Sequence, residues 1–399
     1  MILSPSQARA QGSPWLRVGA HAVPTYIYAD PIPRGGSLSE LRLLQPILMA
    51  RAGALGHRLR LVATVNFEGL TIPDGELAPG DWGEGFIDRR HPHTYVHEVV
   101  LTFQQPVGPT VVSLSAGKGF APFGTDDPMA RPVLRYPVNH HLAQILERAV
   151  AILGVRTGPL LVEGGLFNGD EPERPGQWPR VARFGDSWSG RITFLPRRYL
   201  ELQGSHARVN SPEHRPGFGT DQQKWSLSGR WSGVVRRDPV YGLLEWARTS
   251  EANGFFAFHS FLAEGAWSPG RSRLHFRFER TERPEEARTF SPFRSLRPHL
   301  ENTILGTTRW TIHTAGYGFQ IPTREVATAQ PFIELSYGRI ADVGGGLFDA
   351  RSFYGKTSFW SVTLGARLSA GPHLHRMGRY GVAQDTAEGI RRGHHEQHD

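Results

Sequence analysis

The chain of 399 residues contains no cysteine and almost no lysine, and both absences narrow what it can be. Without cysteine there is no disulfide framework, no cysteine-ligated zinc or iron–sulfur site and no cysteine nucleophile. Only Lys118, Lys224 and Lys356 are lysines, so the formal net charge of +8 comes mostly from arginine. Such a charge suits anionic partners, but the arginines form no basic stripe and no nucleic-acid-binding motif is present. We therefore expect no nucleic-acid partner.

Long apolar runs are missing as well. A helix needs about 20 mostly apolar residues to cross a membrane, whereas the longest apolar stretch runs only from Ala149 to Val155. This excludes a bundle of membrane-spanning helices. Aromatic residues make up 11% of the chain, which argues against wholesale disorder, because a disordered chain lacks the apolar surface that offsets its ordering entropy. A large all-β chain remains, either in water or in a membrane.

Alternation of apolar and polar residues is the strongest positive signal. Between residues 273 and 279, Leu274, Phe276 and Phe278 fall on one face and only polar or charged side chains on the other, as in a β-strand with two different faces. These segments run for about nine to fifteen residues, whereas strands of soluble sheets average about five or six and tilted membrane strands need about 9–11. Sixteen segments are expected to be strands: 15–28, 38–51, 56–68, 93–105, 110–119, 149–156, 159–168, 186–195, 198–209, 222–234, 241–250, 254–264, 271–281, 302–318, 328–340 and 357–369.

The connections between these segments alternate in length. Tight links such as 106–109 and 157–158 are followed by long ones such as 119–148 and 169–185. Barrels of the outer membrane have this alternation, because short turns lie at the periplasmic rim and longer loops at the outer rim. The sequence therefore predicts an all-β fold, a transmembrane antiparallel β-barrel of about 16 strands that spans residues 15–369.

Both ends of the chain fall outside the predicted barrel. Ala8-Arg9-Ala10 fits the small-x-small pattern of a signal-peptidase site, but no charged n-region or long apolar h-region precedes it. We expect residues 1–14 to be the remnant of an export signal shortened by a downstream start codon, or else a disordered start with a chance Ala-x-Ala. Residues 370–399 are polar and rich in histidine, and we expect a mobile tail.

Three passages resemble the porin O/P-like group of phosphate-selective outer-membrane porins. They are GKGFAPFG at 117–124, EGGLFNGDEP at 163–172 and the strand end at 210–213, together with the sixteen-strand alternation. The resemblance implies a passive channel in the cell outer membrane, a homotrimer whose third outer loop folds into the lumen. This chain departs from the group in two features. The phosphate-selective members use rings of lysine, whereas this chain has only three lysines. Their last strand usually ends on a terminal aromatic residue, whereas here residues 370–399 follow the last predicted strand.

A third loop folded into the lumen would set the constriction, since a sixteen-stranded barrel is wide enough to hold water. This loop, 119–148, carries more cations than acids. Rings of arginine or lysine favour anions, so we expect a preference for anions without strict selectivity. The alternative is a solvated outer loop whose charges pair with one another. The predicted constriction residues are Lys118, Arg131, Arg135, His140, His141 and Arg148, and the acids of the loop are Asp126, Asp127 and Glu147.

Apolar residues at 142, 145, 146, 149 and 150 have the spacing of a helix, so this part of the loop is expected to be either a short helix or the start of the sixth strand.

Seven arginines of the predicted strands have the register of the lumen face. We expect them to point inward, because an arginine that faces lipid at the midplane costs about 2–4 kcal/mol. They either bias selectivity or only solvate the wall. The predicted wall residues are Arg58, Arg60, Arg230, Arg273, Arg277, Arg309 and Arg367. Aromatic residues such as Trp310 and Trp360 are expected on the apolar face or near strand ends.

No motif points to catalysis or to a metal. The sequence has no Gly-x-Ser-x-Gly, and the histidines at 91–97, 373–375 and 394–398 lack the ligand spacing of a known site. We expect no enzyme, no cofactor and no metal. The sequence predicts an outer-membrane porin in the lipid bilayer that admits small anionic or neutral solutes, with a preference for anions such as phosphate. Two alternatives stay open, an outer-membrane barrel enzyme acting on lipid and a soluble secreted all-β binding protein.

Overall fold

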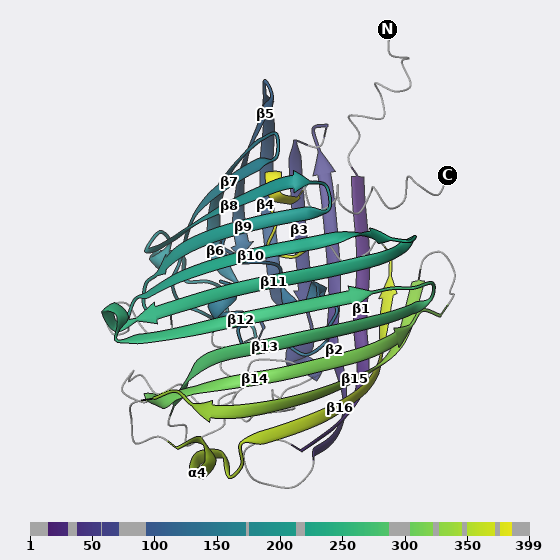
Figure 1. The fold of residues 1–399 in the computed structure, drawn as a ribbon. Helices are drawn as coiled ribbons and strands as arrows, with labels where there is room; N and C mark the ends of the chain where they lie inside the picture. Colours follow the sequence, from purple (N-terminus) through teal and green to yellow (C-terminus); the bar gives the residue numbers. More distant parts are fainter. Residues whose placement is uncertain are drawn as a thin grey trace.

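Sixteen antiparallel strands close into one barrel, in which each strand pairs with the next along the chain and β1 pairs with β16 (Figure 1). This computed structural model describes residues 15–30, 38–56, 58–71, 93–172, 175–212, 220–286, 304–321, 327–344, 349–371 and 376–384. The strands are β1 (Trp15–Asp30), β2 (Leu38–Ala54), β3 (Leu59–Asn66), β4 (Val96–Val107), β5 (Thr110–Gly119), β6 (Arg148–Thr157), β7 (Leu160–Phe167), β8 (Ser187–Arg197), β9 (Leu200–Val209), β10 (Gln222–Val235), β11 (Asp238–Glu251), β12 (Phe256–Trp267), β13 (Ser272–Glu286), β14 (Ile304–Phe319), β15 (Ala327–Asp342) and β16 (Ser358–Ala370).

The predicted all-β barrel of sixteen strands is confirmed. Every predicted strand end lies within three residues of the observed one, except that β13 continues to Glu286. Within the described ranges no helix is long and apolar enough to cross a membrane. The short helices are α2 (Glu68–Thr71), α3 (His140–Ala143) and α4 (Ala350–Tyr354), with 3₁₀ turns at η1 (Pro128–Ala130), η2 (Val181–Arg183) and η3 (Ala252–Gly254).

The two faces of the wall are chemically opposite. On β13, Leu274 and Phe276 are 44% and 46% exposed on the outside, while His275 and Arg277, which alternate with them, are buried in the lumen. The same pattern recurs on β10, where Leu227 is exposed and the neighbouring Ser226 is buried. An apolar exterior around a polar interior is the distribution of a barrel that lies in lipid.

The two rims of the barrel also differ. At one rim, which we call the turn rim, tight hairpins connect the strands, and β1 begins and β16 ends there. Arg236 and Arg237 form the two-residue turn between β10 and β11, both with positive φ (53° and 80°), as a turn that matches the twist of the strands requires. The opposite rim carries the longer connections, except for the short link through η3. Short turns mark the periplasmic side of such barrels.

The third loop, residues 120–147 between β5 and β6, lies inside the barrel, and nearly all of its residues are buried. The apolar stripe predicted at 142–150 is not one helix. α3 ends at Ala143, and β6 begins at Arg148, so Ala149 and Val150 belong to the strand. The strand alternative is therefore correct for the second half of the stripe. The loop packs with the wall into an apolar core that includes Phe120, Phe123 and Tyr136.

A second segment also fills the lumen. Residues 376–384, which we call the C-terminal segment, are buried throughout, although they fall in the tail that we expected to be mobile. Figure 1 shows their yellow ribbon within the barrel near β4 and β9. Their apolar members Met377 and Tyr380 join the core of the third loop, so this part of the tail is packed inside the barrel. Residues 1–14 and the histidines at 91, 373–375 and 394–398 lie outside the described residues.

If the outer face of the barrel lies against lipid, the cost of a charge on it should depend on depth in the bilayer. Leu244 is exposed near the middle of β11, and Val235 is exposed beside the turn at the rim. Arginine costs about 2–4 kcal/mol at the midplane of a bilayer and about 0–1 kcal/mol near its interfaces. Leu244→Arg should lower the free energy of unfolding in lipid vesicles by that larger amount, and the control Val235→Arg by the smaller one, measured by urea unfolding. Equal small losses would contradict a lipid-facing wall.

Candidate pore constriction

The third loop is tied to the wall at points around the lumen. The backbone N–H of Leu134 donates to Glu334 on β15 at 2.9 Å, and that of Val138 donates to Glu279 on β13 at 2.8 Å. The N–H of Gly124 donates to the Ser205 hydroxyl on β9, also at 2.9 Å. Gly124 has a φ of +63°, and a Cβ at this position would lie 1.6 Å from the Ala143 carbonyl oxygen. Only glycine fits here, so the loop is held in one path across the barrel.

The arginines predicted in the constriction do lie in the lumen, but each is paired with an acid. Arg135 contacts Glu279 at 3.1 Å, and Arg148 contacts Glu171 at 2.8 Å. Arg131 lies 3.4 Å from Glu245, and all three arginines are buried. Lys118 donates to the Thr94 hydroxyl. The arginines of the loop therefore pair with acids of the wall and of another loop, and not with one another in a solvated loop as the alternative had it.

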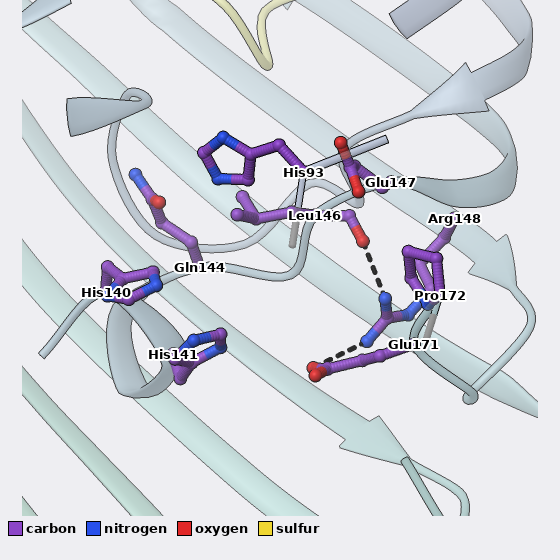
Figure 2. Close-up of a pocket in the computed structure, with 9 residues that line it drawn as sticks. All are labelled: His93, His140, His141, Gln144, Leu146, Glu147, Arg148, Glu171 and Pro172. Carbon is purple, nitrogen blue, oxygen red and sulfur yellow. Dashed lines mark hydrogen bonds and ion pairs between the residues drawn. The ribbon is translucent and has the colours of Figure 1, made fainter. Parts of the chain in front are cut away.

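His140 and His141, the two predicted histidines, lie on α3 with ring centroids 3.8 Å apart. They line a cavity of about 20 Å³ together with Gln144, Arg148 and Glu171 (Figure 2). A cavity needs about 10–15 Å³ to hold one water molecule, so this one has no room for a solute. The sticks in Figure 2 show Arg148 between the Leu146 carbonyl and Glu171, which fixes the strand start against the loop.

Two histidines lie beside the third loop, His97 on β4 and His93 just before that strand. His97 Nδ1 lies 2.7 Å from Glu147, and its Nε2 lies 3.3 Å from Asp127. Burial alone would raise the pKa of Glu147, but the hydrogen bond and the charge of His97 outweigh it and lower that pKa. His93 lies 3.3 Å from Glu68. Across the described part of the chain, no group of three or more His, Asp or Glu side chains is arranged to hold a metal ion.

Of the predicted wall arginines, four lie deep on the inner face. Arg277 donates to Glu264 at 2.6 Å, Arg230 pairs with Asp126, and Arg367 lies 3.7 Å from Glu334. Arg273 points inward on β13 and forms no ion pair with the described residues. Arg60 is half-buried on the inward register of β3.

Arg58 and Arg309 do not lie on the lumen wall, contrary to the prediction. β3 begins at Leu59, so Arg58 lies exposed in the turn before it. Arg309 is one residue out of register, because the fully buried Trp310 takes the inward place on β14 and packs against Phe359. Arg309 instead contacts Glu282 at 2.7 Å on the outer face. Trp310 is likewise not the lipid-facing aromatic that the sequence suggested, since it belongs to the lumen core with Val138 of the third loop.

Sequence reasoning missed the acids that match these cations. Glu163 on β7 makes two hydrogen bonds with Arg191 on β8, at 2.7 and 2.8 Å, and both side chains are buried. The alternation of β7 and β8 already puts both residues on the inward register, so the signal was present in the sequence. Attention to arginines alone overlooked it. The wall acids that face inward in the described strands are Glu98, Glu163, Glu201, Glu245, Glu264, Glu279 and Glu334.

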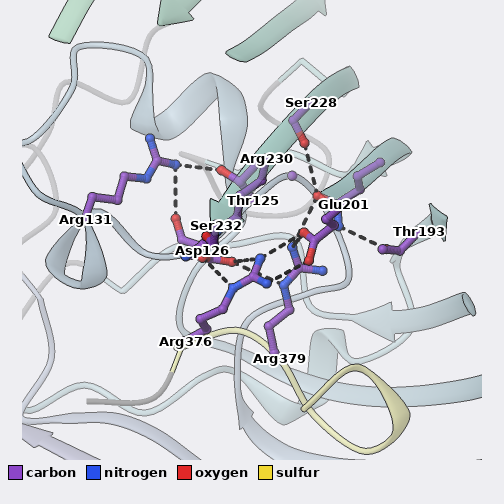
Figure 3. Close-up of polar contacts among 12 residues, drawn as sticks. Thr125, Asp126, Arg131, Thr193, Glu201, Ser228, Arg230, Ser232, Arg376 and Arg379 are labelled. Carbon is purple, nitrogen blue, oxygen red and sulfur yellow. Dashed lines mark hydrogen bonds and ion pairs between the residues drawn. The ribbon is translucent and has the colours of Figure 1, made fainter. Parts of the chain in front are cut away.

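The most highly charged point of the lumen joins the third loop to the C-terminal segment. Arg376 contacts both oxygens of Glu201, at 2.7 and 2.9 Å, and donates to Asp126 at 2.6 Å (Figure 3). Arg379 lies 3.2 Å from Glu201 and 3.4 Å from Asp126, and Arg230 approaches Asp126 from β10. We call Asp126, Glu201, Arg376 and Arg379 the latch. Nothing in the sequence signals it, because no pattern links residue 376 to residue 126.

Burial works against the charges in the latch. Burial alone would raise the pKa of Asp126, but the Arg376, Arg230 and Arg379 guanidiniums outweigh it and hold this pKa well below its usual range. Burial and the nearby Arg191 lower the pKa of Arg379 to about 10, so it stays a cation at neutral pH. All four groups are therefore charged, and each depends on the others for compensation.

The charged side chains of the lumen are almost out of contact with solvent. Arg379 of the latch and the wall residues Arg191 and Arg277 are each 2% exposed or less. In an open, water-filled pore the charged groups of the wall would be wet, whereas here the third loop and the C-terminal segment take the place of water. The lumen is therefore packed at the level of the latch.

No family model and no curated protein matches the sequence. Solved structures match in fold. An anion-selective porin from Comamonas acidovorans aligns with a TM-score of 0.53 and 11% identity over 90% of this chain and 100% of that one. OmpT, an outer-membrane protein of Vibrio cholerae, aligns with a TM-score of 0.51 and 10% identity, over 92% and 100% of the two chains. Its variant lacking loop L8 gives 0.52 and 12%, over 89% and 99%.

This chain has the porin fold. At such low identities the likeness concerns the fold alone, and membership of the porin O/P-like group is not confirmed. The third loop of this chain lies inside the barrel, and its path is fixed by the acids of β13 and β15.

Arg191 and Glu163 predict a stability effect. Removing one partner of a buried ion pair costs about 3–5 kcal/mol, because the other charge is left uncompensated. Arg191→Ala should lower the free energy of unfolding by that amount, whereas the pair Arg191→Met with Glu163→Gln should lower it much less. Urea unfolding of the folded barrel in vesicles measures both. Equal losses for the two variants would contradict the pairing.

Asp126 predicts a pH effect. Its folded pKa is depressed below the ordinary value of 3.8, so its contribution to stability is fully present above about pH 4 and is lost as the pH falls through the folded pKa. The stability gap between the wild type and Asp126→Asn should therefore be largest near neutral pH and should narrow in acid. Unfolding between pH 6 and pH 2 measures it.

A control for this effect is Asp221→Asn. Asp221 pairs with Arg208 in solvent, and such surface pairs contribute about 0–1 kcal/mol, so its gap should stay small throughout. A gap for Asp126→Asn that does not change with pH would contradict the depressed pKa.

Proposed function

We propose that this protein is a channel of the cell outer membrane through which small hydrophilic solutes diffuse without a cofactor. The observation that carries the proposal is the closed sixteen-stranded barrel with an apolar outside, a charged inside and a third loop folded across the lumen. Such a barrel encloses a polar interior between two aqueous compartments. The mechanism is sieving by the space that the third loop leaves, biased by the charges that line it.

We also propose a weak preference for anions, phosphate-like ones included. The net charge of +8 supports it, as does the inward Arg273, which forms no ion pair with the described residues. The similar barrel from Comamonas acidovorans is described as anion-selective. The preference should be weak, because the buried arginines of the lumen are largely matched by acids and contribute little net charge along the path.

A homotrimer in the lipid bilayer remains part of this proposal and rests on the resemblance to porins. Chemical cross-linking of the folded protein in lipid, followed by electrophoresis without heating, would detect three linked chains. A species of one chain at every cross-linker concentration would contradict it.

The channel proposal predicts current steps. Protein inserted into a planar bilayer should give stepwise conductance, and a KCl gradient should give a reversal potential on the anion side. Arg273→Gln should move that potential toward the cation side, because it removes an inward cation that has no ion-pair partner among the described residues. Arg197→Gln is the matched control, since Arg197 is exposed at a tight turn. A cation preference of the wild type would overturn the anion proposal.

A further inference from the structure

The C-terminal segment occupies the lumen of a proposed channel, and the inference below rests on that proposed function. Met377 is 0% exposed, Val382 1% and Arg379 2%. Burial this complete means that side chains of the third loop and the wall surround the segment on every side. This part of the lumen is therefore filled by the chain's own residues.

The barrel does not need this segment to close. The ladder between β1 and β16 ends at the pair Ala20 and Ala370, before the segment begins, and all sixteen strands pair without it. Within 376–384 no residue belongs to a strand. The segment is thus a separate piece of chain inside a finished wall.

Three kinds of side-chain contact hold the segment. At one end, Arg376 and Arg379 bind Asp126 and Glu201 in the latch. In the middle, the Tyr380 hydroxyl donates to Glu98 on β4 at 2.8 Å and accepts the backbone N–H of Phe120 at 3.1 Å.

At the other end, Val382 and Ala383 pack against Leu161 of β7, and the N–H of Val382 donates to the Ser113 hydroxyl on β5 at 3.2 Å. These contacts join the third loop to the β4–β9 side of the wall. The segment fills the space between them on the side of the turn rim, where β16 ends.

The ion pairs of the latch add little net stability to the seated position, so the segment can leave it. The desolvation penalty of a buried ion pair largely cancels its Coulomb attraction, so such a pair adds little net stability. Outside the barrel, Arg376 and Arg379 would be solvated by water, and Asp126 would keep Arg230 as a partner. Since the segment follows β16 on the same chain, its release and return are intramolecular.

We propose that residues 376–384 are an autoinhibitory plug. In its seated position the plug closes the passage between the third loop and the β4–β9 wall, and its release toward the turn rim opens that passage. The latch holds the plug on the third loop, which is also the element that defines the constriction. The conductance of the channel is therefore set by the fraction of time that the plug is seated.

Two truncations test this proposal. A chain ending at Gly371 lacks the plug, and a chain ending at Gln384 keeps it and lacks only the residues beyond. The first should show a several-fold higher conductance or open fraction than the full chain in planar bilayers, and the second should match the full chain. Heat-modifiable migration on a gel checks that both barrels are folded. Equal conductance of the folded Gly371 chain and the full chain would overturn the proposal.

A point variant covers the case in which truncation prevents folding. Arg376→Gln with Arg379→Gln unfastens the latch and keeps the chain length, and it should raise the open fraction. Arg197→Gln with Arg208→Gln, two exposed arginines, is the matched control and should have no effect. A folded latch variant that conducts like the wild type would overturn the role of the latch.

A disulfide lock tests release directly, because the chain has no cysteine of its own. Ser113→Cys with Val382→Cys should cross-link the plug to β5 under oxidation, since the Ser113 hydroxyl and the Val382 nitrogen are 3.2 Å apart. The oxidised protein should conduct least, and reductant should restore the level of the single variant Val382→Cys. Identical conductance before and after reduction of a fully cross-linked sample would show that the plug never leaves, and would overturn gating by release.

The outcomes separate the two proposals. If the folded Gly371 chain gives no current, the barrel is not a channel and the proposed function fails. If the Gly371 chain and the full chain conduct equally, the channel stands and the plug fails.

Discussion

Charge compensation inside a closed space is the constraint on which this structure depends. The alternation of the strands places arginines on the inner face, and the third loop and the C-terminal segment take up the space that water would occupy around them. A guanidinium in such surroundings is stable only beside a carboxylate. The pairs Arg277 with Glu264 and Arg191 with Glu163 meet this requirement across neighbouring strands. The path of the third loop depends on wall acids as well, since Glu334 and Glu279 accept backbone N–H groups of the loop.

The strands of the barrel wall could be predicted from the sequence far better than the packing of the segments inside the lumen. Strand positions depend on local alternation and on turn residues, and both can be recognised within about ten residues of sequence. The inner and outer faces of β13 are those that the alternation predicted. Arg309 marks the limit of this reasoning. Its strand was placed correctly, but the inward place belongs to Trp310 because the third loop supplies an apolar partner in Val138. The choice between two adjacent residues was made by a segment more than 160 residues away.

The packing of the lumen could not be predicted for the same physical reason. Arg376 and Asp126 are separated by 250 positions, and no periodicity relates them. The tail is polar because of its arginines and histidines, and a polar end of a chain is usually solvated, so a mobile tail was predicted. Here its arginines find acids, and Met377 and Tyr380 find the apolar core of the loop. The acids Glu163 and Glu201 were within reach of the alternation, and pairing inward acids with inward arginines would have indicated a neutral lumen.

The place of the C-terminal segment in the chain has a consequence for assembly. Chains emerge from the ribosome with the N-terminus first, so residues 376–384 are made after every strand of the wall. They acquire a lumen to enter only once β16 has paired with β1, because the cavity has no boundary before that seam forms. Closure of the wall therefore comes before enclosure of the segment. A barrel caught between these two steps would have its full wall and an interior still open to water.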